Sequence, residues 1–432
     1  MKRKMIATVL IASMCMATAC SGERDRSEDR RINDVDPDDI EYEELIELDA
    51  GYDDDEVNDA YKEFIFNIFS ACSDNEKGNA NYMISPASIM MALEIANAGA
   101  SGDTQDQITE MLFPGIGTNE GLTFAADLMD RINNSNGVEF HAANSIWLNE
   151  DRILDYINQD YIDYCMDNFD AEIVNAPFNN VTVDDINDWV SDKTDGMIPE
   201  LLDDLNPDTV AVILNAIAFD GEWATPFEDY QVNENGIFTN ADGEQEQVTM
   251  LSDTLYRYFE TDKARGFMKC YSEGEYAFVG ILPNDESISA NEFASSFTAE
   301  DYEEFWNSLD DTLDVNILMP EFTSDYSVDL NDIVSELGMT EAFDEDNADF
   351  SLMAQIPDAN IFVSRIIHKT HIEVDRNGTR AAAATAVMED AASCAEPVPS
   401  VNVYLDRPFV YMIVDTETGT PVFMGTVNSV NG

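Results

Sequence analysis

Residues 209–223 read TVAVILNAIAFDGEW, and Asn215 is the only polar residue between Val210 and Phe219. A strand that covers a core with one face alternates apolar and polar residues, because successive side chains point to opposite sides of the sheet. This run does not alternate. It therefore predicts a strand that is buried on both faces, at the centre of a large sheet.

The segments around this strand predict a mixed fold. Apolar residues at helical spacing mark AYKEFIFNIFSAC (60–72) and VDDINDWVSDKTDGMIPELL (183–202), and the latter helix should end near Gly196. NYMISPASIMMALEIANAGA (81–100) predicts a short strand, a Ser-Pro turn and a helix. Further strands are predicted at 138–150, 275–283, 313–322, 361–374, 408–415 and 421–427. Helices come early and strands late, without an internal repeat or a second domain boundary, which favours one α+β domain with mainly antiparallel sheets.

The chain is strongly acidic. Its 432 residues include 88 Asp and Glu against 21 Lys and Arg, for a net charge of −67. Residues 23–55 hold 16 acidic and 4 basic residues, so most of the excess lies in the body. Such a surface repels phosphates, which argues against nucleic acid and anionic lipid as partners.

The N-terminus has the features of a targeting segment. Lys2, Arg3 and Lys4 precede the apolar run MIATVLIASMCM, which ends in ATAC. Small residues before a cysteine resemble a bacterial lipoprotein processing site, with Cys20 as the lipidated residue, although Ala17 stands where that pattern usually has Leu. An ordinary secretory signal is the alternative. We expect a signal peptide at 1–19, an acidic disordered tether at 20–55 and the folded domain at 56–432, in the cell envelope or secreted.

No residue pattern predicts an enzyme, a metal site or a cofactor. The four body cysteines, Cys72, Cys165, Cys270 and Cys394, match no metal spacing and are too few for a disulfide scaffold. His368 and His371 are three apart, but the alternation around them predicts a strand, on which they point to opposite faces. We expect no cofactor and no metal.

A run of small residues, GTRAAAATAVMEDAAS (378–393), follows the last long predicted strand and precedes Pro397 and Pro399. Alanine has the highest helix propensity, so a surface helix or linker is one interpretation. A β-branched strand before the run and prolines after it fit a helix poorly. The local pattern alone leaves the choice open.

Several segments together resemble the serpin family. NYMISPASIMMAL, INDWVSDKTDGMIPELL, VILNAIAFDGEWATPF, LMPEF, LGMTEAFDEDNADFSLM, HKTHIEVDRNGTRAAAATAV and DRPFVYMIVDTETGTPVFMGTV follow one another in family order between about Val57 and Asn431. The resemblance implies helices around three mainly antiparallel sheets with an exposed reactive-centre loop. It also implies a monomer that acts as a suicide substrate and traps a target protease covalently when the cut loop inserts into the main sheet.

In this resemblance the small-residue run is the hinge of the reactive loop. The hinge residues are Gly378, Thr379, Arg380, Ala381, Ala382, Ala383, Ala384 and Thr385. If the run inserts as a strand, Thr379, Ala381, Ala383, Thr385 and Val387 face inward, and Glu389 falls awkwardly in the same set. The family spacing from Gly378 puts the reactive bond between Ala392 and Ser393; a shift to Ala391 or Ser393, or recognition of Asp390, remains open.

The resemblance implies two further groups of site residues. Ser85, Ser88, Asn215 and His368 resemble a polar cluster where the main sheet opens, and Trp223 resembles the aromatic residue at its top. The bait residue Ala392 suits the shallow pocket of an elastase-like or subtilisin-like serine protease. A non-inhibitory binding protein and an inhibitor of papain-like cysteine proteases are the alternatives.

Overall fold

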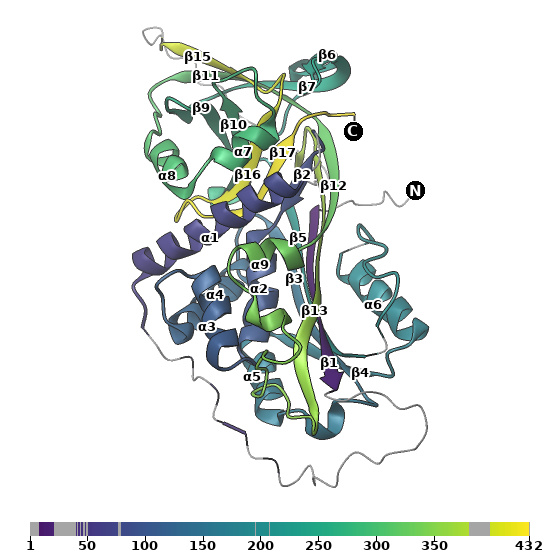
Figure 1. Ribbon diagram of the computed structural model, residues 1–432. Coiled ribbons are helices and arrows are strands. Elements are labelled where there is room, and N and C mark those ends of the chain that lie inside the picture. The colour runs from purple at the N-terminus through teal and green to yellow at the C-terminus, as the bar shows by residue number, and fades with distance from the viewer. Residues whose placement is uncertain are drawn as a thin grey trace.

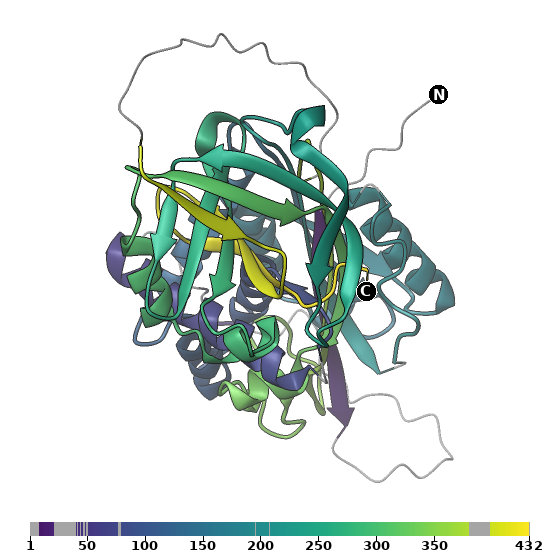
Figure 2. The ribbon, with the colours of Figure 1, turned by 90° about the horizontal axis from the view of Figure 1, so that it is seen from above.

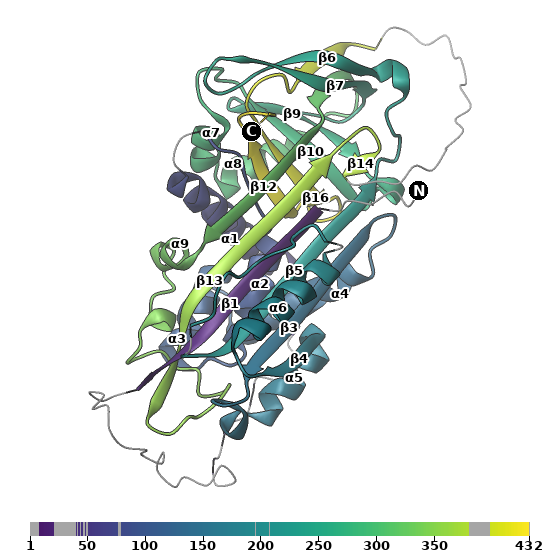
Figure 3. The ribbon, with the colours of Figure 1, turned by 90° about the vertical axis from the view of Figure 1, so that its right-hand side faces the viewer.

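The computed structural model describes residues 8–20, 40, 42–43, 45, 48, 51–76, 79–194, 196–206, 208–379 and 398–431. Three sheets and a set of helices form one body, in which most helices lie on one side of the main sheet and α6 covers the other (Figures 1 and 3). The helices are α1 (Asp54–Asn75), α2 (Pro86–Asn97), α3 (Gly102–Leu112), α4 (Thr118–Asn133), α5 (Gln159–Phe169), α6 (Asn180–Lys193), α7 (Ala290–Ser296), α8 (Ala299–Asn307) and α9 (Asn331–Glu336).

The main sheet runs in the order β12, β13, β1, β5, β3, β4. Its strands are β1 (Thr8–Cys20), β3 (Glu139–Asn149), β4 (Ala171–Ala176), β5 (Thr209–Glu222), β12 (Phe322–Asp329), β13 (Ala359–Val374) and the short β14 (Gly378–Thr379). All neighbours are antiparallel except β3 and β4. As expected, β5 is buried on both faces: its residues pack against the main core on one side and against α6 on the other.

The other two sheets lie in the upper part of the molecule in Figure 1 and are turned toward the viewer in Figure 2. The six-stranded sheet contains β2 (Tyr82–Ile84), β17 (Pro421–Val427), β16 (Phe409–Asp415), β10 (Tyr276–Pro283), β9 (Ala264–Cys270) and β8 (Tyr258–Glu260). The four-stranded sheet contains β15 (Ser400–Tyr404), β11 (Asp314–Pro320), β7 (Gln245–Leu255) and β6 (Val232–Thr239). The expected α+β fold with three mainly antiparallel sheets is confirmed.

Local sequence explains the main boundaries. The Asp53 side chain caps α1 by accepting from the backbone N–H groups of Asp55 and Glu56, and Ser85 caps α2 with Pro86 in its first turn. After α6 the chain reverses at Gly196, where φ is +81°. No helix in the described part of the chain is long and apolar enough to cross a membrane.

The described residues of the N-terminal region, for which we expected a signal peptide and a disordered tether, contact the folded body. Residues 8–19 of the expected signal peptide, together with Cys20, form the strand β1 of the main sheet. In the described part of the expected tether, the Tyr42 hydroxyl donates to the carbonyl of Tyr156, and the Tyr52 hydroxyl donates to Asp127. The predicted domain boundaries stay predictions, because a strand in the whole chain does not tell whether a peptidase later removes it.

Candidate functional site

A strand position between β5 and β13, here called the loop slot, is the centre of the candidate site (Figure 3). These two long strands do not pair with each other. The hinge strand β14 occupies one end of the slot, with Gly378 opposite Glu222, and Thr379 opposite Gly221 on β5 and Val374 on β13. β1 occupies the rest of the slot and pairs antiparallel with both neighbours.

A tight turn leads the chain from β13 into the slot. The Asp375 carboxylate accepts from the backbone N–H groups of Asn377 at 2.6 Å and Gly378 at 3.1 Å, and the Asp375 N–H donates to the Gly378 carbonyl at 2.9 Å. A Cβ on Gly378 would lie only 2.1 Å from the carbonyl oxygen of Gly221. Close approach to β5 therefore requires glycine where the hinge begins.

Thr379 is already inside the sheet. It is fully buried, and its hydroxyl shares a hydrogen bond with that of Tyr271. The Tyr271 ring stacks on Trp223 with 4.7 Å between the centroids and 8° between the planes. The first inward hinge residue thus enters a closely packed aromatic environment.

Trp223 holds the turn by two hydrogen bonds. Its backbone N–H donates to the Asn377 carbonyl and its indole N–H to the Asp375 carbonyl, each at 2.9 Å. Trp223 therefore lies at the end of the sheet where the hinge enters.

A buried cation supports this aromatic group. Lys269 is 3% exposed; its ammonium lies 2.9 Å from the Asp253 carboxylate and 4.3 Å from the centre of the Phe227 ring, and it donates to the carbonyl of Thr225. Burial lowers the pKa of Lys269, while Asp253 acts in the opposite direction. The ion pair keeps a charge where an unpaired ammonium would be costly.

Arg376, just before the hinge, is bound on two sides. Its guanidinium lies 3.1 Å from Asp229 and 3.7 Å from Glu321, and its backbone N–H also donates to Glu321. Burial raises the pKa of Glu321, and Arg376 partly offsets this. Both acidic partners of Arg376 come from other segments of the chain.

The predicted polar cluster is brought together in two parts. In one part, the Ser85 N–H donates to His368 Nε2 at 3.1 Å, and the Ser85 hydroxyl donates to the Val422 carbonyl and accepts from the Ser88 N–H. In the other, the Asn215 amide donates to Asn144 Oδ1 at 2.8 Å. All of these side chains are fully buried.

β1 separates the two parts of this cluster. Asn215 on β5 and His368 on β13 both lie opposite Ala12. Asn215 Oδ1 is buried and has no hydrogen-bond partner in the described part of the chain. β5 and β13 are thus held one strand apart at the point where the residues of the cluster were expected to meet.

The structure describes only some of the remaining predicted site residues. Arg380, Ala381–Ala384, Thr385, Ala392, Ser393 and Cys394 lie outside the described residues. Cys20 ends β1, opposite Ala359. Cys72 and Cys165 are free and buried, and Cys270 is free and half-buried. His368 and His371 lie on β13 as expected, and His371 Nδ1 contacts Asp325 at 2.7 Å.

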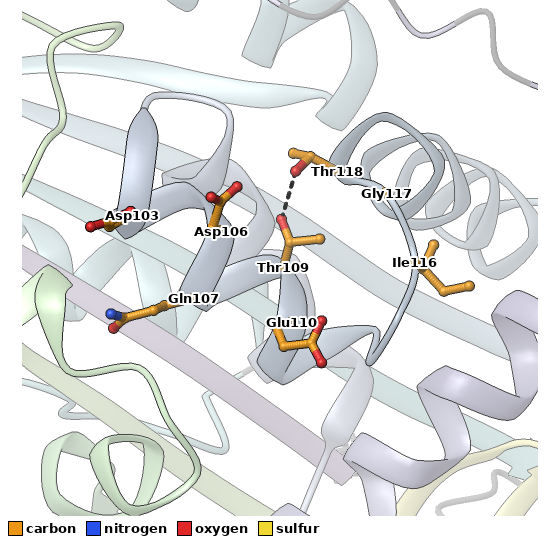
Figure 4. A pocket seen from close by; sticks show the side chains of 8 residues that line it. All are labelled: Asp103, Asp106, Gln107, Thr109, Glu110, Ile116, Gly117 and Thr118. Carbon is orange, nitrogen blue, oxygen red and sulfur yellow. Dashed lines mark hydrogen bonds between the residues drawn. The ribbon is translucent and has the colours of Figure 1, made fainter.

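A shallow pocket between α3 and the start of α4 exposes the carboxylates of Asp103, Asp106 and Glu110, and its Thr109 and Thr118 hydroxyls bond to each other (Figure 4). No three His, Cys, Asp or Glu side chains in the described residues lie close enough together to hold one metal ion, and this includes the three carboxylates of the pocket.

Comparison with known families and structures gives a consistent result. The family model described as "Serpin (serine protease inhibitor)" matches residues 59–430. A serpin-like protein of Methanosarcina mazei is 33% identical over 390 residues, which are 87% of each chain. The human leukocyte elastase inhibitor is 28% identical, and the match covers 87% of this chain and all of that protein.

Solved structures agree. The native state of tengpin, a thermophilic serpin, is 34% identical with a TM-score of 0.79, and the match covers 91% of this chain and 98% of tengpin. The latent state of tengpin is 32% identical with a TM-score of 0.76, over 88% of this chain and 99% of that one.

Proposed function

Because the chain belongs to the serpin family, we propose that it is an irreversible suicide-substrate inhibitor of serine proteases. A protease attacks the reactive loop with its own nucleophile and forms an acyl-enzyme. The cut loop then inserts between β5 and β13 and carries the protease with it. Insertion competes with hydrolysis of the ester, so the inhibitor must insert quickly.

The observation that carries this proposal is the state of the hinge. Gly378 and Thr379 already pair with β5 inside the loop slot, and Thr379 is buried there. The next residues inward, Ala381 and Ala383, are small. Insertion can therefore proceed as extension of an existing strand, without a new nucleation step and without bulky side chains that must pass between two strands.

The target we propose is an elastase-like or subtilisin-like protease. The spacing from Gly378 puts Ala392 before the reactive bond, and residues 381–400 contain no Lys or Arg. A small apolar bait residue fits a shallow pocket and cannot pair with the acidic pocket of a trypsin-like protease. The similarity to a relative named leukocyte elastase inhibitor is in line with this choice.

We expect elastase to form a covalent complex with the chain 21–432 that survives boiling in detergent, and to release a C-terminal fragment that begins at Ser393. Gel electrophoresis and the mass of the fragment measure both. As a matched control, Ala392→Arg should move trapping from elastase to trypsin. Trapping of the unchanged chain by trypsin-like enzymes alone would contradict the site assignment. Cleavage without a complex would favour the non-inhibitory alternative, and a complex with papain alone would favour the cysteine-protease alternative.

We further propose that the mature protein is held at a bacterial cell envelope through a lipid on Cys20, with the acidic residues up to about Asp55 as spacer. The basic start, the apolar run and the small residues before Cys20 support this. A lipid anchor would keep the inhibitor at the surface that it protects.

Cys20→Ser should abolish partitioning of the protein into a detergent phase, because the acyl chains supply nearly all of its membrane affinity. Phase separation of a lysate from a bacterial expression host, followed by immunoblotting, measures this. Cys72→Ser is a suitable control, since Cys72 is buried in the body and should have no effect. Unchanged partitioning of the Cys20 variant would place the anchor elsewhere.

A further inference from the structure

The strand β1 (Thr8–Cys20), here called the leader segment, occupies the position that the cut loop is expected to take. In the register with β5, Thr379 lies opposite Gly221, and Thr8 lies opposite Phe219, two residues further along. β1 therefore continues the line of β14 in the same direction (Figure 3). An inserted hinge would bring Ala381 to the place of Thr8.

The pairing of β1 extends along the whole slot. It pairs with β5 from Thr8 to Ala17 and with β13 from Val9 to Cys20, with one register shift on each side. A central strand satisfies its backbone groups on both edges, which is the geometry of strand addition by a peptide ligand. Leader and loop cannot both occupy these positions.

The side chains of the leader suit the slot. Met14 and Met16 are fully buried and belong to the main core. At the same register an inserted loop would bring Val387 and Glu389. The leader thus supplies an apolar residue where the loop would have to bury a carboxylate, and no charged residue occurs from Met5 to Gly22. Because both segments belong to one chain, the leader is also present at a high effective concentration.

The buried polar cluster that includes Asn215 and His368 indicates that the sheet has a second arrangement. With β1 in the slot, Ala12 lies between Asn215 and His368, and Asn215 Oδ1 is left buried without a partner in the described part of the chain. A buried amide oxygen without a hydrogen bond is unfavourable. If the leader departs, β5 and β13 can pair directly and bring Asn215 next to the strand of His368.

We propose that the leader segment Thr8–Cys20 is an intramolecular ligand of the loop slot, and that the unprocessed chain therefore cannot insert its loop. Such a chain is cut as a substrate and does not trap the protease. Cleavage before Cys20 removes residues 8–19 from the sheet and creates the inhibitor. The second statement rests on the proposed function, whereas the occupancy of the slot does not.

The test compares the full chain 1–432, made without a processing peptidase, with the chain 21–432 and two full-length variants. Met14→Asp puts an unpaired charge into the core and should expel the leader, and Met14→Leu is the matched apolar control. Amide hydrogen exchange of residues 9–19 should be about 1,000-fold slower in the full chain and in Met14→Leu than in Met14→Asp, as expected for a central strand.

Titration with elastase then measures how much protein is consumed per protease inactivated. We expect at least about a five-fold higher consumption for the full chain and Met14→Leu than for 21–432 and Met14→Asp. Fast exchange of residues 9–19 in the full chain would overturn the proposal, and so would slow exchange combined with trapping as efficient as that of 21–432. If 21–432 does not trap any protease, the proposed function fails, and slow exchange in the full chain would still support the leader as ligand of the slot.

Discussion

We expect cleavage of the reactive loop to raise the melting temperature of the chain 21–432, which lacks the leader segment, by roughly 10–30 °C, because the released strand would complete the main sheet. About a dozen new ladder hydrogen bonds, each with a net contribution of about 0.5–1.5 kcal/mol, amount to on the order of 10 kcal/mol. For a domain of this size, each kcal/mol moves the melting temperature by roughly 1–1.5 °C. Burial of the inserted side chains adds to this shift.

The loop slot makes this expectation specific. Among the described residues, the hinge pairs with β5 through Gly378 and Thr379. After cleavage, the residues that follow can pair along the whole length of β5 and β13. Thermal unfolding followed by circular dichroism, before and after quantitative cleavage with elastase, measures the shift. The full chain serves as control and should shift much less, because β1 already fills the slot. An unchanged melting curve of cut 21–432 would refute loop insertion.

The sequence predicted those parts of the fold that depend on local pattern. The unbroken apolar run became β5, the alternating run 361–374 became most of β13, and the Ser-Pro turn before α2 is capped by Ser85 as expected. These signals are local, because period and capping residues are properties of a few neighbouring positions.

The details of the site depend on contacts between distant segments, which a single sequence does not reveal. Tyr271, which bonds to Thr379, and Asp253, which pairs with Lys269, had no local signal of their own. Lys269 did offer one, since it lies in the otherwise apolar stretch FMKCY of a chain with few basic residues.

The apolar N-terminal run predicts a targeting segment, and the same pattern is equally compatible with a central strand, because both need an uncharged run.

Thr379→Arg should turn the inhibitor into a substrate. Thr379 is fully buried between β5 and β13, and its hydroxyl bonds to Tyr271. The space is already filled: a Cβ on Gly221, which pairs with Thr379, would lie 2.7 Å from the Phe219 ring and 2.9 Å from Tyr271. A guanidinium at position 379 would have to enter this closely packed environment or stay outside. An unpaired buried charge costs several kcal/mol, so the barrier to insertion rises.

The bait sequence around Ala392 is unchanged in this variant, so the protease should cut the same bond at a similar rate. A rise of only 1.4 kcal/mol in the insertion barrier slows insertion about ten-fold, while hydrolysis of the acyl-enzyme continues at its own rate. Most encounters then end with a cut inhibitor and a free protease. In the chain 21–432, we expect the moles of inhibitor consumed per mole of elastase inactivated to rise from near one to on the order of ten or more. Arg380→Glu is the matched control: strand alternation predicts that this residue faces outward after insertion, so the moles of this variant consumed per mole of elastase inactivated should stay near one. If both variants consume about one mole of inhibitor per mole of elastase inactivated, the inward assignment of Thr379 is wrong. A strand that buries this residue would insert more slowly with an arginine in its place.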